Sequence, residues 1–185
     1  DLLNGGTGRD EMRGGLGNDI YVVDQQDRIY ELPNEGIDTV RAGFSYALGE
    51  NIENLRLTGN DPINGWGNRL DNLLVGNAGD NLLSGGQGRD TLNGGAGDDS
   101  LRGGSGADSF IFNGGHDVIL DFENDIDVIR IDDALWAPNP LTVADVLQLA
   151  RIENGSVLFD FGGGNSLRLQ GFTDIQALAD DLVIY

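Results

Sequence analysis

The sequence predicts an all-β fold, a parallel β-roll in which tight turns and short strands alternate along a solenoid. Two observations predict it: a nine-residue period runs through residues 67–120, and every period joins a glycine-rich half to one apolar position. The units read GNRLDNLLV, GNAGDNLLS, GGQGRDTLN, GGAGDDSLR and GGSGADSFI over residues 67–111, followed by the degenerate FNGGHDVIL. An earlier block over residues 5–22 follows the same period as GGTGRDEMR and GGLGNDIYV.

Each period is expected to form a turn followed by a three-residue strand. Glycines at positions one, two and four permit positive φ angles and let carbonyl oxygens crowd around one centre. Position six ends the turn with a carboxylate or an amide. Of positions seven to nine only the middle side chain points inward, so the eighth position must be apolar. The apolar residues at this position are Met12, Tyr21, Leu74, Leu83, Leu92, Leu101, Phe110 and Ile119.

The charge pattern predicts cations as partners. Two units close one coil, so the sixth positions of alternate units stack about 4.8 Å apart. Two carboxylates at that separation repel by about 3 kcal/mol at an effective dielectric constant of about 20. The net charge of −20, from 11 basic and 31 acidic residues, argues against nucleic acids and anionic membrane surfaces as partners.

The ligand chemistry predicts calcium as the cofactor, with several ions bound. The absence of cysteine excludes disulfides and thiolate metal sites. Carboxylates and main-chain carbonyls are hard oxygen ligands, which favour calcium over zinc or copper, and magnesium prefers to keep its waters.

The pattern G-G-x-G-x-D-x-U-x, with U apolar, resembles the repeat-in-toxin (RTX) family of bacterial secreted proteins. The resemblance implies ions held between turns by paired aspartates, best Asp90 with Asp108 and Asp99 with Asp117, and by carbonyls of the first four turn positions. The neutral Asn72 and Asn81 are expected to bind weakly or to use amide hydrogen bonds instead. The candidate metal ligands in the repeats are Asp1, Gly5, Gly6, Thr7, Gly8, Asp10, Gly14, Gly15, Leu16, Gly17, Asp19, Asn72, Asn81, Gly85, Gly86, Gln87, Gly88, Asp90, Gly94, Gly95, Ala96, Gly97, Asp99, Gly103, Gly104, Ser105, Gly106, Asp108 and Asp117.

Residues 23–66 are predicted to form an inserted set of longer coils between the first block (residues 1–22) and the second. The interval from Asp19 to Asn72 is one residue short of six units, and the insert contains the strand-like stretches IDTVRAGFSYAL and NIENLRLTGN. This texture resembles the larger coils between RTX repeat blocks. The acids of the insert, Asp24, Asp27, Glu31 and Asp38, either cradle another calcium ion or are solvated turn residues, and the second interpretation is favoured.

The second block is predicted to end at residue 131, in a stretch that resembles the closing element of RTX domains and adds Asp121 and Asp127 to the candidate metal ligands. Residues 132–185 are predicted to form a C-terminal cap. Its final ALADDLVIY is similar to the uncleaved C-terminal signal with which RTX proteins leave the cell by type I secretion.

Within the cap, local sequence signals predict four features. Pro138 and Pro140 break the chain, and a helix runs from Thr142 through Arg151. A hairpin turns around residues 162–164, and the Thr173/Gln176 spacing predicts a capping box for a last helix.

The resemblance implies a secreted bacterial module that folds on calcium and supports type I secretion and an attached domain. An enzyme is not expected: the lone His116 is interpreted as a turn residue, and any catalytic domain would lie upstream of Asp1. The alternative is a polysaccharide-binding or adhesive module, of the kind found beside alginate epimerases. A glycosidase-like carboxylate pair is not excluded by the residue count.

Overall fold

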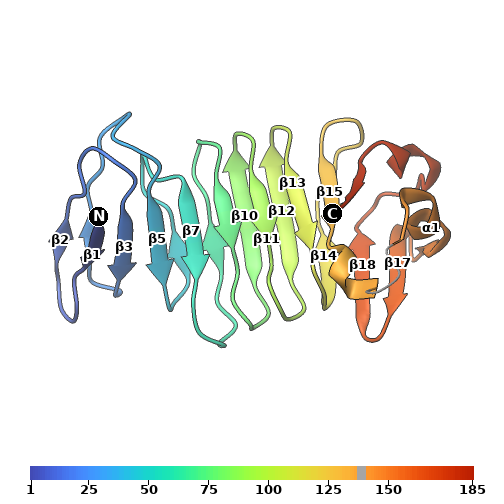
Figure 1. Cartoon of the computed structure of the whole chain (residues 1–185), viewed down its shortest axis with the longest axis horizontal. Coiled ribbons are helices and arrows are strands. Elements are labelled where there is room, and N and C mark those ends of the chain that lie inside the picture. Colours follow the sequence, from blue (N-terminus) through green and yellow to red (C-terminus); the bar gives the residue numbers. More distant parts are fainter. Residues whose placement is uncertain (137–140) are drawn as a thin grey trace.

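The computed structural model describes residues 1–136 and 141–185, and its strands stack along one long axis from the N-terminal coil to the C-terminal cap (Figure 1). One parallel sheet has nine strands, in the order β1 (Leu2–Asn4), β3 (Ile20–Val23), β5 (Thr39–Ala42), β7 (Asn54–Leu57), β9 (Leu73–Val75), β11 (Thr91–Asn93), β13 (Ser109–Phe112), β15 (Val128–Ile131) and β19 (Leu182–Ile184). The second sheet has eight, in the order β16 (Ala150–Glu153), β17 (Ser156–Gly162), β18 (Asn165–Leu169), β14 (His116–Ile119), β12 (Ser100–Ser105), β10 (Leu82–Gln87), β8 (Gly65–Trp66) and β6 (Tyr46–Ala47). A small parallel sheet pairs β2 (Glu11–Met12) with β4 (Arg28–Ile29).

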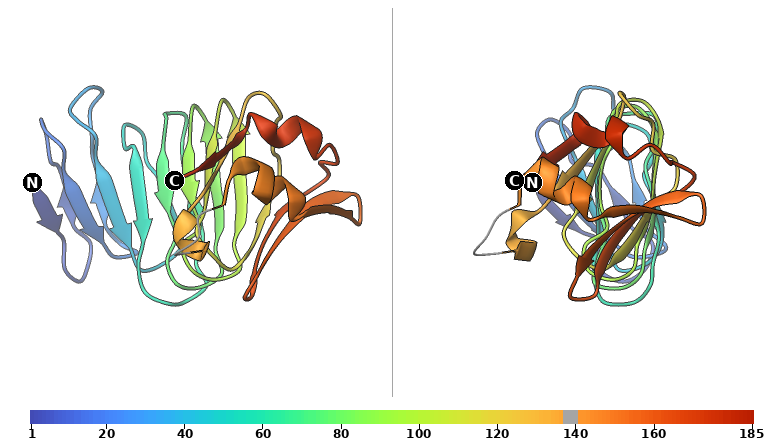
Figure 2. Two further views of the ribbon diagram at one scale, coloured as in Figure 1. Left: turned by 45° about the vertical axis from the view of Figure 1, so that its right-hand side comes forward. Right: turned by 90° about the vertical axis from the view of Figure 1, so that its right-hand side faces the viewer.

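The two large sheets form the layers of a β-roll, which confirms the predicted fold class. Successive strands of the repeats alternate between the two layers, so each regular coil contributes one strand to each sheet. Viewed along the long axis, the coils superpose as a flattened loop (Figure 2, right).

The hydrophobic core of the repeats consists of the eighth-position side chains, stacked in register. In one sheet, Leu92 pairs with Leu74 and with Phe110, each two repeat units away. In the other, Leu101 pairs with Leu83 and with Ile119 at the same spacing. All six side chains are at most 1% exposed. The nine-residue period therefore predicts correctly which side chains point inward.

The insert continues the roll, although its coils differ in length. Ile20 pairs with Thr39, Thr39 with Asn54, and Asn54 with Leu73, so three coils connect the two repeat blocks. The first and third of these coils are one residue longer than two repeat units, whereas the middle coil is three residues shorter. The first and second repeat blocks thus belong to one uninterrupted sheet.

The cap extends both sheets past the last repeat. β18 pairs in parallel with β14, and β19 pairs in parallel with β15, so both edges of the final coil are covered. β17 and β18 form the expected antiparallel hairpin. Phe161 stacks on Phe112, with ring centroids 5.0 Å apart, and joins the cap to the core of the roll.

Two helix predictions in the cap are wrong in part. The first helix, α1 (Val143–Gln148), has a Thr142/Asp145 capping box but ends before Arg151, because β16 pairs with β17 from Ala150 onward. The last helical turn, η2 (Gln176–Ala179), lacks the Thr173 box.

At η2, the Asp174 carboxylate accepts the N–H groups of Gln176 and Ala177 instead. A further turn of 3-10 helix, η1 (Asp133–Trp136), follows β15. The predicted break at Pro138 and Pro140 lies outside the described residues. Within the described ranges, no helix is both long enough and apolar enough to cross a membrane.

Candidate calcium sites

A column of acidic and amide side chains runs along the nine-stranded sheet. From β3 onward, the residue directly before each strand of this sheet belongs to it; this first column comprises Asp19, Asp38, Glu53, Asn72, Asp90, Asp108, Asp127 and Asp181. Within the column, a backbone N–H of one coil donates to the side-chain oxygen of the next. These bonds join Asp19 N to Asp38 Oδ1 (2.8 Å), Asp38 N to Glu53 Oε2 (2.8 Å), Asn72 N to Asp90 Oδ1 (2.8 Å), Asp90 N to Asp108 Oδ1 (2.8 Å) and Asp108 N to Asp127 Oδ1 (2.9 Å).

A second column lies on the opposite side of the roll and comprises Asp10, Asp27, Asn81, Asp99 and Asp117. The same bond recurs between Asp10 N and Asp27 Oδ1 (3.1 Å), Asn81 N and Asp99 Oδ1 (2.7 Å), and Asp99 N and Asp117 Oδ1 (3.0 Å). Both aspartate pairs expected in the second repeat block, Asp90 with Asp108 and Asp99 with Asp117, are therefore brought together.

The column acids are buried and incompletely satisfied. Asp90, Asp99, Asp108 and Asp117 are at most 2% exposed. One oxygen of each accepts a backbone N–H, but Oδ2 of Asp90, Asp99 and Asp117 is buried without a hydrogen-bond partner. A buried ionised oxygen with no partner is costly, so these atoms need a proton or a cation.

Burial also shifts the pKa values of these carboxyl groups. Burial raises the pKa of Asp117 to about 8, that of Asp90 to about 7 and that of Asp99 to about 6. Burial also raises the pKa of Asp108. The raised pKa values mean that burial favours the protonated form of these carboxyl groups. A bound divalent cation would instead stabilise the ionised form, and hard carboxylate oxygens suit calcium.

The glycines at the repeat corners allow the turns to approach closely. At the first position, a Cβ added to Gly94 would lie 2.1 Å from Oδ2 of Asp99. At the second position, Gly104 has a φ of +103°, and its Cβ would lie 2.1 Å from the Gly86 carbonyl oxygen of the neighbouring coil. Side chains at these corners would therefore displace the acids and carbonyls that the turns assemble.

The predicted main-chain ligands lie in these same turns, and the backbone groups of some of them already form hydrogen bonds. The Ser105 carbonyl already accepts the Gly88 N–H (3.0 Å), whereas Gln87 and Ala96 use their N–H groups to reach the preceding coil. In the first block, Leu16 is 85% exposed, as expected at the tip of a turn. Positive φ angles recur at the glycines of repeat positions two and four, namely Gly6, Gly8, Gly15, Gly17, Gly86, Gly88, Gly95, Gly97, Gly104 and Gly106. The remaining turn residues, Gly5, Thr7, Gly14, Gly85 and Gly103, complete the same corners.

The two asparagines use hydrogen bonds where the other column members present carboxylates. Asn72 donates its side-chain N–H to the Glu53 carbonyl (3.1 Å), and Asn81 donates to the Ile63 carbonyl (2.6 Å). Each amide oxygen accepts a backbone N–H of its own turn, as in Asn68 N to Asn72 Oδ1 (2.7 Å). This arrangement is one of the two expected for these positions.

The acids at the C-terminal end of the array have varied surroundings. Asp127 is buried, and both of its oxygens accept N–H groups, from Asp108 and Glu123. Asp121 binds the N–H groups of the Gly103 and Gly104 turn (2.9 and 3.0 Å).

At the N-terminal end, Asp1 lies beside Asp19, but the contact is made by its α-amino group, 2.5 Å from Asp19 Oδ1, and its own side chain is exposed. Asp10 instead faces Asp27, which the sequence reasoning had not paired with it.

Two acids of the insert are buried, which overturns the interpretation of Glu31 and Asp38 as solvated turn residues. Asp38 is 1% and Glu31 is 8% exposed, and desolvation raises the pKa of both carboxyl groups. Sequence reasoning also missed Glu53. The signal that could have found it was the interval from Asp19 to Asn72, which leaves room for three coils and hence for two further column positions.

His116 begins β14 and is exposed, so it is a strand residue rather than a turn residue. Its Nδ1 lies 2.9 Å from Ser166 Oγ, and its backbone N–H donates to Asp98 (3.0 Å).

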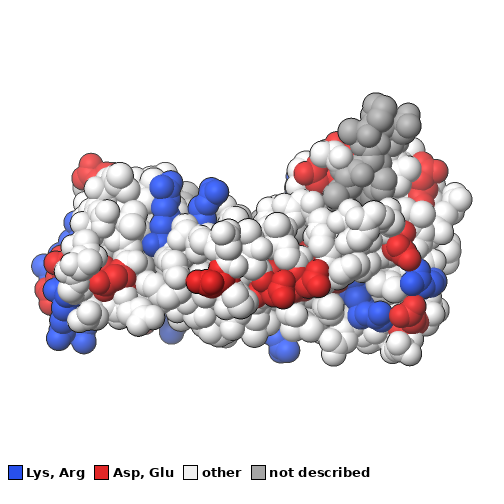
Figure 3. All heavy atoms as spheres, turned by 90° about the horizontal axis from the view of Figure 1, so that it is seen from below, with Lys and Arg blue, Asp and Glu red and all other residues white. Residues whose placement is uncertain are grey.

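On the face shown in Figure 3, acidic side chains gather in a row along the middle of the long axis. This surface agrees with the expectation of cationic partners.

Comparison with known proteins identifies the repeats. Residues 1–29, 66–101 and 84–119 match the family described as RTX calcium-binding nonapeptide repeat (4 copies). The endo-1,3-1,4-beta-glycanase ExsH of Rhizobium meliloti (strain 1021) is 42% identical over 66 residues, which cover 35% of this chain and 14% of that protein. The endo-1,3-1,4-beta-glycanase EglC of the same strain is 41% identical over 86 residues, or 40% of this chain and 18% of that protein.

The chain thus spans less than a fifth of the length of either curated relative. Among solved structures, the extracellular lipase LipA from Serratia marcescens is similar over 100% of this chain and 40% of that chain, with a TM-score of 0.43 and 17% identity. Calcium is the ion that the matched repeats bind. Residues 1–29 and 66–119 of the chain are therefore RTX calcium-binding nonapeptide repeats.

Proposed function

We propose that this chain is a calcium-triggered folding module of a protein exported from a bacterial cell. The observation that carries the proposal is the set of buried, unpaired Oδ2 atoms on Asp90, Asp99 and Asp117. At low calcium these carboxylates would ionise more readily in the unfolded chain, which therefore stays unfolded. At the higher calcium concentration outside the cell, ions bind between the coils, and binding becomes folding free energy.

Far-UV circular dichroism of the whole chain tests the folding step. We expect a largely unfolded spectrum in chelator at neutral pH and a strand spectrum after calcium is added. Magnesium should substitute poorly, since it prefers a small octahedral cage with several waters. The onset should be cooperative, because each coil pairs with its neighbours. A fully folded chain in chelator at neutral pH would contradict the proposal.

Export by a type I system is the second part of the proposal, and residues 132–185 would carry the signal. The test is secretion of the fragment when it is produced together with a type I exporter. Removing residues 132–185 should stop secretion, whereas the double change of Asp90 and Asp108 to Ala should leave export intact and impair only folding outside the cell. Export of the fragment without residues 132–185 would remove this part of the proposal.

A polysaccharide-binding role is the second candidate, and the names of the matched relatives favour it. Both are endo-1,3-1,4-beta-glycanases, so related repeats occur in proteins that act on glycans. An array of acidic and neutral glycans, probed with the calcium-loaded chain, tests this role. Binding lost in chelator would support it, and the absence of binding to any glycan would exclude it for the glycans tested. Any catalytic activity of the longer protein would reside in a separate domain.

A further inference from the structure

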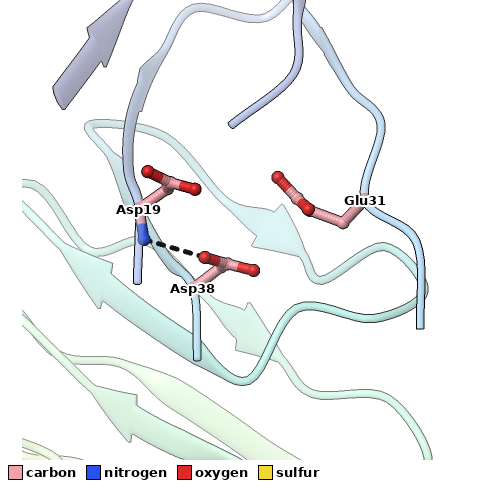
Figure 4. Close-up of side chains that lie close together, drawn as sticks. All are labelled: Asp19, Glu31 and Asp38. Atoms are coloured by element: carbon pink, nitrogen blue, oxygen red, sulfur yellow. Dashed lines mark hydrogen bonds between the residues drawn. The ribbon is translucent and has the colours of Figure 1, made fainter. Parts of the chain in front are cut away.

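Three buried carboxylates meet at the junction of the first repeat block and the insert. Asp19 ends the turn before β3, Asp38 is the next member of the first column, and Glu31 approaches from the segment that follows β4 (Figure 4). One oxygen from each carboxylate lies within 4.8 Å of the others. Their exposures are 2%, 1% and 8%, so the cluster is enclosed by protein.

The hydrogen bonds around the cluster hold the carboxylates in place. Asp38 Oδ1 accepts the Asp19 N–H at 2.8 Å. Glu31 Oε1 accepts from the Tyr21 hydroxyl and from the Gly14 N–H. Tyr21 is fully buried in the core, and its hydroxyl also accepts the Gly14 N–H at 2.6 Å. The eighth-position residue of this repeat is therefore a tyrosine with its polar end at the cluster.

Two oxygens of the cluster are left without a partner. Asp19 Oδ2 and Glu31 Oε2 are both buried, and neither has a hydrogen-bond partner. In the described part of the chain, the Asp1 α-amino group contacts Asp19 Oδ1, but no arginine side chain forms an ion pair with any of the three acids. Three hard oxygen ligands at this separation suit a calcium-sized cation, which takes carboxylates in flexible geometry.

We propose that Asp19, Glu31 and Asp38 bind a calcium ion at a site outside the nonapeptide pattern. The inference goes beyond the proposed function, because Glu31 and Asp38 lie outside the residues that match the repeat family. Glu31 reaches the ion from a separate segment, so this ion clamps the insert onto the first repeat block. The repeat sites of the second block, by contrast, pair residues that are two repeat units apart.

Calcium counting by native mass spectrometry tests the site in the whole chain. Glu31→Gln keeps an acceptor for the Tyr21 hydroxyl and the Gly14 N–H but removes the charge. We expect this variant to bind one ion fewer than the unmodified chain at saturation. Asp38→Asn, which keeps the acceptor for the Asp19 N–H, should lose the same ion. The matched control is Glu50→Gln, which removes the same charge at an exposed position of the insert and should leave the count unchanged.

Terbium provides a second readout that depends on Tyr21. Because the Tyr21 hydroxyl contacts Glu31, excitation of tyrosine should sensitise the emission of a terbium ion at this site. Tyr21→Phe should lower that emission while the calcium count stays at the wild-type value, whereas Glu31→Gln should lower both. An unchanged calcium count in both Glu31→Gln and Asp38→Asn would overturn the proposal and indicate that the carboxylates share protons instead. If the part of the emission that Tyr21→Phe removes survives Glu31→Gln, the proposal would be overturned as well.

Discussion

Asp99→Asn should make the roll less dependent on calcium while preserving its hydrogen bonds. The introduced amide can still accept the Asn81 N–H, as Asp99 Oδ1 does at 2.7 Å. Asn81 itself shows that an amide fits a column position, since its side-chain N–H reaches the Ile63 carbonyl of the preceding coil. The change therefore removes one buried charge with little change of shape.

The magnitude follows from burial of the Asp99 carboxylate. A carboxyl group whose pKa rises from 3.8 to about 6 costs the folded, metal-free state about 3 kcal/mol once the pH exceeds 6. Without calcium, Asp99→Asn should raise the equilibrium constant for folding by about two orders of magnitude. In calcium, the variant lacks one carboxylate ligand and should bind the ion at this position less tightly. An ion with a dissociation constant of about 10⁻⁴ to 10⁻³ M adds about 1.4–2.7 kcal/mol to the unfolding free energy at roughly 10 mM calcium, so up to that amount should be lost.

Two titrations followed by far-UV circular dichroism measure both effects. Trimethylamine N-oxide can drive folding of the metal-free chain in chelator, and Asp99→Asn should fold at a lower osmolyte concentration. The slope of folding against the logarithm of the calcium concentration counts the ions taken up, and it should fall. Asp98→Asn is the control, because Asp98 is the exposed neighbour with the same charge. A destabilised Asp99→Asn in chelator, or an effect equal to that of Asp98→Asn, would refute the reasoning.

Three further outcomes are expected. Burial raises the pKa of Asp117 to about 8, so without calcium its contribution to stability is present below about pH 4 and is lost as the pH rises through 8. Circular dichroism in chelator should therefore show the folded fraction falling from about pH 5 to about pH 8. In calcium, the folded fraction should instead rise over the same range. Gly104→Ala should lower the unfolding free energy of the calcium-loaded chain by about 2–5 kcal/mol in urea melts, because the added Cβ would collide with the Gly86 carbonyl oxygen. Gly163→Ala is the control: its φ is also positive but its Cβ meets no close neighbour, so the loss should be only about 1–2 kcal/mol. Similar losses at both positions would contradict a role for close turn stacking. Deleting residues 132–185 should abolish calcium-induced folding, because it exposes the strand edges of both sheets. Deleting residues 1–22 should reduce calcium-induced folding less. If the chain without residues 132–185 still folds with calcium, the cap is dispensable.

The regular part of the roll could be predicted from sequence because one residue type recurs at one spacing. The period identified the buried stack of Leu74, Leu92 and Phe110, and together with the RTX resemblance it identified the pairing of Asp99 with Asp117. Both depend only on a coil length of two repeat units, which the second block keeps. The hairpin around residues 162–164 was equally predictable, since three glycines offer the positive φ angles that its turn uses.

The errors arose where tertiary pairing or a change of coil length overrides local signals. The helix predicted through Arg151 ends early because the last predicted turn pairs as a strand with β17 instead. The Thr173 capping box failed because Asp174 offers a carboxylate one residue nearer the helical turn. Glu53 escaped notice, and Glu31 was interpreted as a solvated turn residue, because coils of unequal length shift the acids out of the nine-residue register. Glu53 compensates with a longer side chain that still reaches the Asp38 N–H.

The bonds of the two columns give the solenoid a polarity. In the columns, the N–H of an earlier coil is satisfied by the carboxylate of a later one, as between Asp90 and Asp108, so each coil is completed by its successor. For these N–H-to-carboxylate bonds, shortening the chain from its C-terminal side removes acceptors of coils that remain, whereas shortening it from the N-terminal side removes only donors. The exposed Asp80 lies outside the columns and has the opposite polarity, because its carboxylate accepts the N–H of Asp98 in the later coil. Water can replace this exposed carboxylate as the acceptor. We therefore expect the buried columns to assemble backward along the chain, from the cap toward the first turn.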